Sequence, residues 1–161
     1  MRSPLLLALL MAPLALAGCG SGDAERGGGR DPSGTPLPPG HEDVRVIDRW
    51  ARALAQGDVE AAADRFAVPS VAQNGGPPVT LDSREEVLAF NDALPCGGRL
   101  VKARPAGRYI AATFRLTERP GGDCGPGAGA LARTAFVVRD GKIRQWRRLP
   151  DPESNPAGDP A

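Results

Sequence analysis

Residues 46–62 read VIDRWARALAQGDVEAA, and this stretch decides how the chain folds. Apolar residues recur here at spacings of three and four, which is typical of a helix with one buried face. Gly57 is suited to end that helix, and Asp58 is suited to cap a following one. The stretch therefore predicts a helix over 42–56, a break, and a second helix over 59–66.

A third helix and a short hairpin follow in the sequence. Ser83 and Glu86 have the spacing of a capping box, and they predict a helix that ends before Pro95. The Gly-Gly-Pro-Pro cluster upstream breaks the chain, and short strands near 70–73 and 79–81 can flank it as a hairpin.

Beyond Pro95 the apolar period changes from helical spacing to strict alternation. Strands are predicted over 99–104, 109–118, 132–139 and 142–149, and the last two are joined by an Asp140-Gly141 turn. Three helices that cover one face of a curved antiparallel sheet make an α+β fold, and the curvature leaves a conical hollow.

The chain resembles the nuclear transport factor 2-like superfamily, also called SnoaL-like. The resemblance is carried by residues 46–62 and by the closing FVVRDGKI of 136–143, and it extends over about 42–150. It implies a cone-shaped α+β barrel. Some members are isomerases, cyclases or dehydratases with an acid and a base in the hollow, whereas others bind ligands or partners. Many members dimerise through the sheet, so the resemblance is compatible with a homodimer, and a tethered monomer is equally permitted.

The N-terminus reads as an export signal. Residues 1–19 are MRSPLLLALLMAPLALAGC, in which Arg2 precedes a short apolar run and small residues follow. Leu16–Cys19 resembles the lipobox of bacterial lipoproteins, which implies cleavage after residue 18 and acylation of the Cys19 sulfur. An ordinary signal peptide is the alternative. The lipobox interpretation predicts a protein outside the cytoplasm, anchored to the bacterial cell membrane.

The remaining chain divides into three parts. Residues 19–41 are rich in Gly, Pro, Ser and charge, which predicts a disordered tether. Residues 42–151 form the folded domain, and residues 152–161 form a disordered tail.

Composition excludes several function classes. The chain has 20 Lys and Arg against 19 Asp and Glu, so the basic surplus typical of nucleic-acid-binding proteins is missing. One His and three Cys leave little material for a metal centre. We therefore predict no metal, no cofactor and no nucleic-acid partner.

Two cysteines remain after Cys19 is assigned to lipid. An exported chain lies where disulfides persist, so Cys96 and Cys124 are predicted to form one. Two free or redox-active thiols are the alternative, although a Cys-X-X-Cys motif is missing.

The chemistry of the hollow indicates binding more than catalysis. The acidic residues fall mostly in helical stretches beside arginines, and the acid and base of the isomerases match no position, so no catalytic residue is assigned. We predict a module that holds a small ligand or a protein partner. A small SnoaL-like enzyme is the alternative, which a buried carboxylate facing Tyr109 would favour. The candidate pocket-lining residues are Trp50, Phe66, Phe90, Tyr109, Phe114 and Phe136.

The final strand is strongly basic. Alternation over 142–149 places Lys142, Arg144 and Arg148 on one face together with Trp146. These three cations are candidates for contact with an anionic partner or lipid headgroup. The alternative is a solvated sheet face whose arginine stems cover the indole.

The lipid anchor has a direct test. When the protein is expressed in its host with radiolabelled palmitate, we expect label in the wild-type chain and none in Cys19→Ser, because that sulfur is the acceptor in the lipobox interpretation. The measurement is autoradiography of the purified protein. A wild-type chain that takes up no label would refute the lipoprotein assignment.

Overall fold

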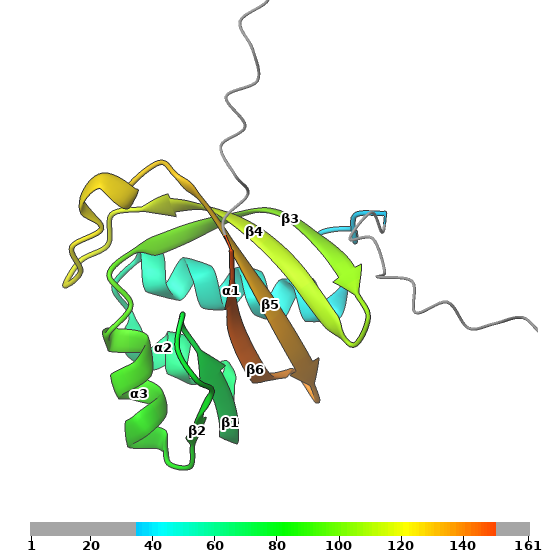
Figure 1. The fold of residues 1–161 in the computed structure, drawn as a ribbon, viewed down its shortest axis with the longest axis horizontal. Helices are drawn as coiled ribbons and strands as arrows, with labels where there is room; N and C mark the ends of the chain where they lie inside the picture. Colours follow the sequence, from blue (N-terminus) through cyan, green and yellow to red (C-terminus); the bar gives the residue numbers. More distant parts are fainter. Residues whose placement is uncertain (1–34, 151–161) are drawn as a thin grey trace, which may run out of the picture.

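The computed structural model describes residues 35–150, and its helices and strands follow the order expected from the sequence (Figure 1). The predicted signal at 1–18, Cys19 and the tail at 152–161 lie outside the described residues. The elements are α1 (Glu42–Ala55), α2 (Val59–Ala63), β1 (Phe66–Gln73), β2 (Val79–Leu81), α3 (Arg84–Asp92), β3 (Gly97–Ala106), β4 (Tyr109–Thr117), a short 3₁₀ turn (Gly125–Gly127), β5 (Leu131–Arg139) and β6 (Lys142–Leu149).

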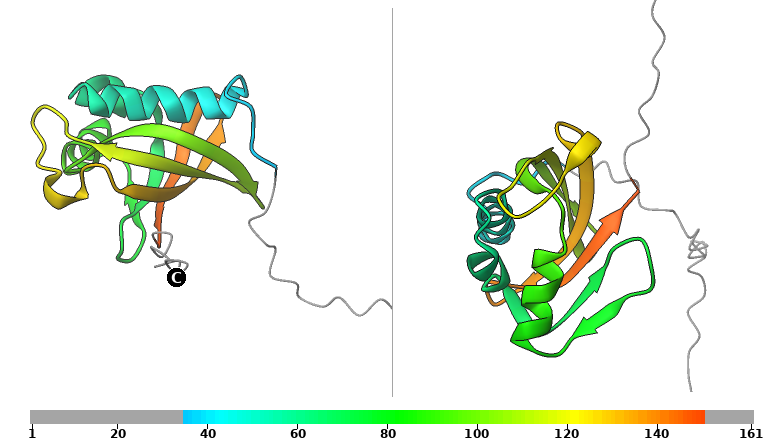
Figure 2. Two further views of the ribbon diagram at one scale, coloured as in Figure 1. Left: turned by 90° about the horizontal axis from the view of Figure 1, so that it is seen from above. Right: turned by 90° about the vertical axis from the view of Figure 1, so that its left-hand side faces the viewer.

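The strands form one six-stranded sheet in the order β2-β1-β6-β5-β4-β3. The sheet is curved, and the helices pack against its inner side (Figure 2). The predicted α+β class, with three helices on a curved sheet, is confirmed. One detail differs: β1 pairs with β6 in parallel, whereas the other neighbours are antiparallel. The strands β1 and β6 are far apart in the sequence, so no short turn between them imposes an antiparallel pair.

The break between α1 and α2 matches the prediction. Gly57 has φ 75°, and a Cβ on it would lie 2.8 Å from Cβ of Pro120, so both its conformation and its surroundings require glycine. Asp58 caps α2 by accepting a hydrogen bond from the backbone N–H of Ala61 at 2.9 Å. This turn sets the angle at which α2 leaves α1.

The second helix is shorter than predicted. It ends at Ala63, and Phe66 already belongs to β1, where it pairs with Ile143 of β6. The backbone N–H of Ile143 donates to the Arg65 carbonyl at 2.7 Å, which draws the chain into the sheet. The helix therefore ends before its apolar spacing does, because Phe66 pairs with a strand that is distant in the sequence.

The other local signals are confirmed. The Ser83 hydroxyl accepts from the Glu86 N–H while the Glu86 carboxylate accepts from the Ser83 N–H, so the capping box is complete. Asp140 and Gly141 have φ of 53° and 69°, as a tight hairpin turn between β5 and β6 requires.

The last part of the predicted tether belongs to the domain. Residues 35–41 are described, and Leu37 packs against the core while its N–H donates to the Ala103 carbonyl at 2.8 Å. Leu37 is a large apolar residue in an otherwise polar segment, and burying it gives this stretch a reason to order. The chain therefore enters the domain beside β3.

Trp50 of α1 lies at the centre of the core. Its ring meets Phe66, Phe114, Phe136 and Trp146 edge-on, with ring centroids 5.4 to 6.5 Å apart. Its indole N–H donates to Oδ1 of Asn91 at 2.8 Å. Asn91 is fully buried and donates in turn to the Val87 carbonyl. The tryptophan therefore joins α1 to four strands and to α3.

We expect Asn91→Ala to lower the free energy of unfolding by roughly 2 kcal/mol, because it leaves the buried Trp50 N–H without an acceptor. Urea unfolding followed by tryptophan fluorescence measures the change. Asn74→Ala is the control, and as an exposed side chain it should stay within about 0.5 kcal/mol. Equal effects of the two substitutions would show that the buried hydrogen bond contributes nothing.

Candidate functional site

A cavity of about 190 Å³ lies between α1, the start of β3 and the inner face of β4, β5 and β6. Each of these elements supplies lining residues because the sheet curves away from the helix there. The lining consists of Trp50, Ala51, Leu54, Asn74, Leu94, Pro95, Cys96, Gly97, Gly98, Phe114, Leu116, Ala132, Thr134, Trp146 and Arg148.

The lining is apolar apart from a few groups. Asn74 is exposed, Thr134 is buried, and Arg148 is half-buried and supplies the lining's ionisable group. Both tryptophans of the chain, Trp50 and Trp146, line the cavity. A space of this kind suits a small apolar molecule with a limited number of polar atoms.

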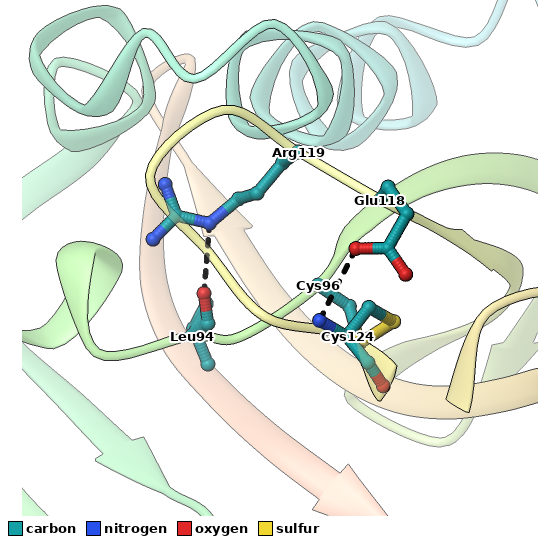
Figure 3. Close-up of a disulfide and its surroundings, with 5 residues drawn as sticks. All are labelled: Leu94, Cys96, Glu118, Arg119 and Cys124. Atoms are coloured by element: carbon teal, nitrogen blue, oxygen red, sulfur yellow. Dashed lines mark hydrogen bonds between the residues drawn. A yellow bond between two sulfur atoms is a disulfide. The ribbon is translucent and has the colours of Figure 1, made fainter. Parts of the chain in front are cut away.

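The disulfide borders the cavity through Cys96. Cys96 and Cys124 are bonded with an S–S distance of 2.07 Å, so the predicted bridge is confirmed (Figure 3). The next residue, Gly97, lies so close to the end of α1 that a Cβ would sit 2.6 Å from Cα of Ala55. The bridge and this close approach together fix the helix end over the cavity.

A buried arginine holds the loop that carries Cys124. Arg119 is only 5% exposed, and its Nε donates to the Leu94 carbonyl at 2.9 Å (Figure 3). Its Nη2 donates to the Asp92 carbonyl at 2.6 Å. Glu118 is exposed, and its carboxylate accepts a hydrogen bond from the Cys124 N–H at 3.3 Å. Sequence reasoning missed Arg119, because no local pattern marks an arginine that caps a helix distant in the sequence.

The predicted aromatic lining divides into two groups. Trp50 and Phe114 line the cavity. Phe66, Phe90 and Phe136 instead pack around the two indoles as core, with Phe90 and Trp146 centroids 5.2 Å apart.

Tyr109 does not line this cavity and lies on the opposite face of the sheet. Its hydroxyl accepts from Nη2 of Arg108 at 2.9 Å and lies 3.3 Å from Oε1 of Gln145. The Arg147 guanidinium lies 5.6 Å from its ring centroid. Tyr109 faces outward because successive residues of β4 point to opposite faces and the next residue, Ile110, faces the core.

The basic residues of β6 do not form the single group that strict alternation predicted. The register shifts between Val137 and Val138, which pair with Gln145 and Ile143, so Arg144 is left as the extra residue of a bulge. Ile143 and Trp146 consequently both face the core.

The three cations have different surroundings as a result. Arg148 lines the cavity, Lys142 donates to the Asp64 carbonyl, and Arg144 pairs with Asp140 at 3.6 Å. Lys142, Arg144 and Arg148 therefore do not form the single surface that was predicted to contact an anionic partner.

Within residues 35–150, no group of three or more His, Cys, Asp or Glu side chains is placed to hold a metal ion. Over the same residues, no helix is both long and apolar enough to cross a membrane.

Comparison with solved structures identifies the fold as nuclear transport factor 2-like. A Sinorhizobium meliloti protein assigned as a polyketide cyclase is 16% identical with a TM-score of 0.53, over 70% of this chain and 95% of that one. A Kribbella flavida protein assigned as a ketosteroid isomerase is 15% identical with a TM-score of 0.51, over 74% and 90%. A nuclear transport factor 2-like protein of unknown function from Cytophaga hutchinsonii is 11% identical with a TM-score of 0.51, over 66% and 88%. No family model and no curated protein matches the chain.

We expect the double variant Cys96→Ser/Cys124→Ser to lose roughly 3.5 kcal/mol of unfolding free energy, because the bridge restricts the unfolded chain. Urea unfolding measures the loss, and Cys19→Ser, which removes a thiol without opening a loop, is the control. A chain carrying only Cys19→Ser, denatured without reductant, should show no free thiol. Two free thiols in that titration would contradict the bridge.

Proposed function

We propose that this protein is a lipid-anchored extracytoplasmic binding module that holds a small, mostly apolar ligand in the cavity beside the disulfide. The observation that carries the proposal is the cavity lining, in which two indoles, Phe114 and several aliphatic side chains surround a space of about 190 Å³. Thr134 and Arg148 supply polar groups that can orient a bound molecule.

The ionisable chemistry of the lining favours binding over catalysis. Isomerases and cyclases of this fold need a base that takes a proton from the substrate. The ionisable group of the lining is the Arg148 guanidinium, which offers hydrogen-bond donors and no acceptor for a substrate proton. Tyr109, the candidate acid, lies on the other face of the sheet beside Arg108 and Gln145.

The alternative is a small enzyme of the isomerase, cyclase or dehydratase type. It is favoured by the assigned activities of two structural neighbours, a polyketide cyclase and a ketosteroid isomerase. These neighbours are 16% and 15% identical to this chain, so they support a shared fold more strongly than a shared reaction.

Anchoring is supported by the N-terminal sequence. The apolar run that ends in Leu-Ala-Gly-Cys at 16–19 matches a lipobox, and at least two acyl chains on such a cysteine give firm attachment to a bilayer. Cys96 and Cys124 are already joined to each other, which leaves Cys19 as the remaining thiol. An exported location also agrees with a disulfide that persists.

Native mass spectrometry of the protein purified from its own host tests the ligand. We expect a small molecule to accompany the wild-type chain, and its loss should change the fluorescence of the chain, since both tryptophans line the cavity. If the chain were recovered in complex with another protein and without a small molecule, a partner-binding role would be favoured instead.

A pair of substitutions locates the ligand. Ala132→Leu places extra side-chain volume in the cavity and should reduce ligand occupancy at least tenfold in the same measurement. Ala111→Leu makes the same chemical change on the other face of the sheet and should retain the ligand. Successive residues of a strand point to opposite faces, and the next residue, Ala112, faces the core. Thermal unfolding of both variants controls for stability. Full occupancy in Ala132→Leu would contradict binding in this cavity.

A further inference from the structure

The charges of the sheet have one sign. Every charged residue in β1 to β6 is an arginine or a lysine, whereas most carboxylates of the described residues lie on the helices or next to them. The strand cations are Arg99, Lys102, Arg104, Arg115, Arg133, Arg139, Lys142, Arg144, Arg147 and Arg148.

Strand register places most of these cations on the face of the sheet that points away from the helices. Residues directly opposite on neighbouring strands share a face. Arg99 is opposite Arg115, and Thr113 is opposite both Lys102 and Arg133. The residues between them face inward, as Phe114 does in the core.

Two more strand cations and one turn residue complete the group. Arg104 is opposite Ala111, and Arg147 is opposite Ala135. Arg108 joins by donating to Oε1 of Gln145 at 3.0 Å. We name this group the outer basic face, and it consists of Arg99, Lys102, Arg104, Arg108, Arg115, Arg133 and Arg147.

The long side chains of this face cover an apolar strip. Thr113, Ala135 and Val137 are 5 to 9% exposed although they point away from the core. The Nε atoms of Arg104 and Arg147 are buried, so these two side chains lie along the sheet. The stems therefore shield the strip while the charged ends remain at the surface.

The outer basic face lacks internal neutralisation. No member of the outer basic face pairs with a carboxylate that the structure describes. The arginines that do pair with carboxylates within residues 35–150 are Arg52, Arg84, Arg119 and Arg144. Two copies that met through this face would bring like charges together, which disfavours a second copy as its partner. Charge complementarity requires an anionic surface of similar breadth.

The chain enters the domain at the β3 edge of the sheet. Leu37 is hydrogen-bonded to Ala103 of β3, the strand that carries Arg99, Lys102 and Arg104. Residues 19–35 reach at most about 55 Å even when fully extended, so Cys19 stays near the domain. A lipid on Cys19 would keep the domain, and with it the outer basic face, within that distance of the bilayer.

We propose that the outer basic face binds the anionic headgroups of the bilayer to which the protein is anchored. Guanidinium groups match phosphate in geometry and charge, and clustered basic residues are attracted to anionic leaflets. The nearness of the bilayer rests on the lipid anchor of the proposed function, whereas the attraction itself depends only on the described residues. The domain would then lie with its sheet on the membrane and its helix layer away from it.

Vesicle co-sedimentation tests this proposal with residues 19–161 carrying Cys19→Ser, which keeps the whole described domain and removes the lipid. We expect binding to vesicles of phosphatidylglycerol and phosphatidylcholine in equal parts, weakening as NaCl is raised, and none to pure phosphatidylcholine. The variant Arg99→Gln/Lys102→Gln/Arg108→Gln should bind about a hundredfold more weakly, at about fivefold per cation.

The matched control is Arg45→Gln/Arg49→Gln/Arg52→Gln on α1. It removes the same formal charge from side chains that are also exposed but lie on the helix layer, where Arg52 is paired with Asp48, and it should bind within about threefold of the parent chain. Circular dichroism of both variants verifies folding.

Three results would overturn the proposal: equal losses in the two variants, unchanged binding after the sheet substitutions, or tighter binding to a soluble polyanion such as DNA than to the vesicles. Because the assay uses neither the lipid nor the cavity, its failure is distinguishable from failure of palmitate labelling or of ligand recovery.

Discussion

The position of Trp50 is the constraint on which the rest of the structure depends. Its ring contacts aromatic residues of β1, β4, β5 and β6, and its N–H is bonded to Asn91 of α3. A single side chain of α1 therefore sets the distance between the helix layer and a sheet that would otherwise be free to flatten. The cavity lies where this contact ends, because beyond Trp50 the smaller residues Ala51 and Leu54 face the sheet.

The parts of the fold that sequence predicted are those whose cause is local. The break at Gly57, the capping box of Ser83 and the Asp140-Gly141 turn each depend on residues within a few positions. The errors arose where a distant partner decides the structure. Phe66 has helical spacing but pairs with Ile143, and Arg144 is expelled into a bulge because β5 fixes the register of β6.

The candidate site was predicted in part for the same reason. The bridge between Cys96 and Cys124 follows from counting the cysteines of a chain whose N-terminal sequence predicts export, and Trp50 and Phe114 follow from apolar periodicity. Periodicity separates inside from outside, but it does not separate a side chain that packs from one that borders a space. Arg119 shows the limit, since its burial depends on carbonyls at the end of α3 that face it only after the loop has closed.

The parallel pairing of β1 with β6 has a consequence for the order in which the molecule assembles. The hairpins from β3 to β6 join neighbours in the sequence, as does the pair of β1 with β2, whereas β1 meets its other partner, β6, only nearly eighty residues later, as the pair Phe66 and Ile143 shows. The ribosome must therefore synthesise residues 142–149 before β1 can gain its parallel partner. Any nascent chain that stalls before residue 142 presents an unpaired β1 edge, which makes that species vulnerable to aggregation and to proteases.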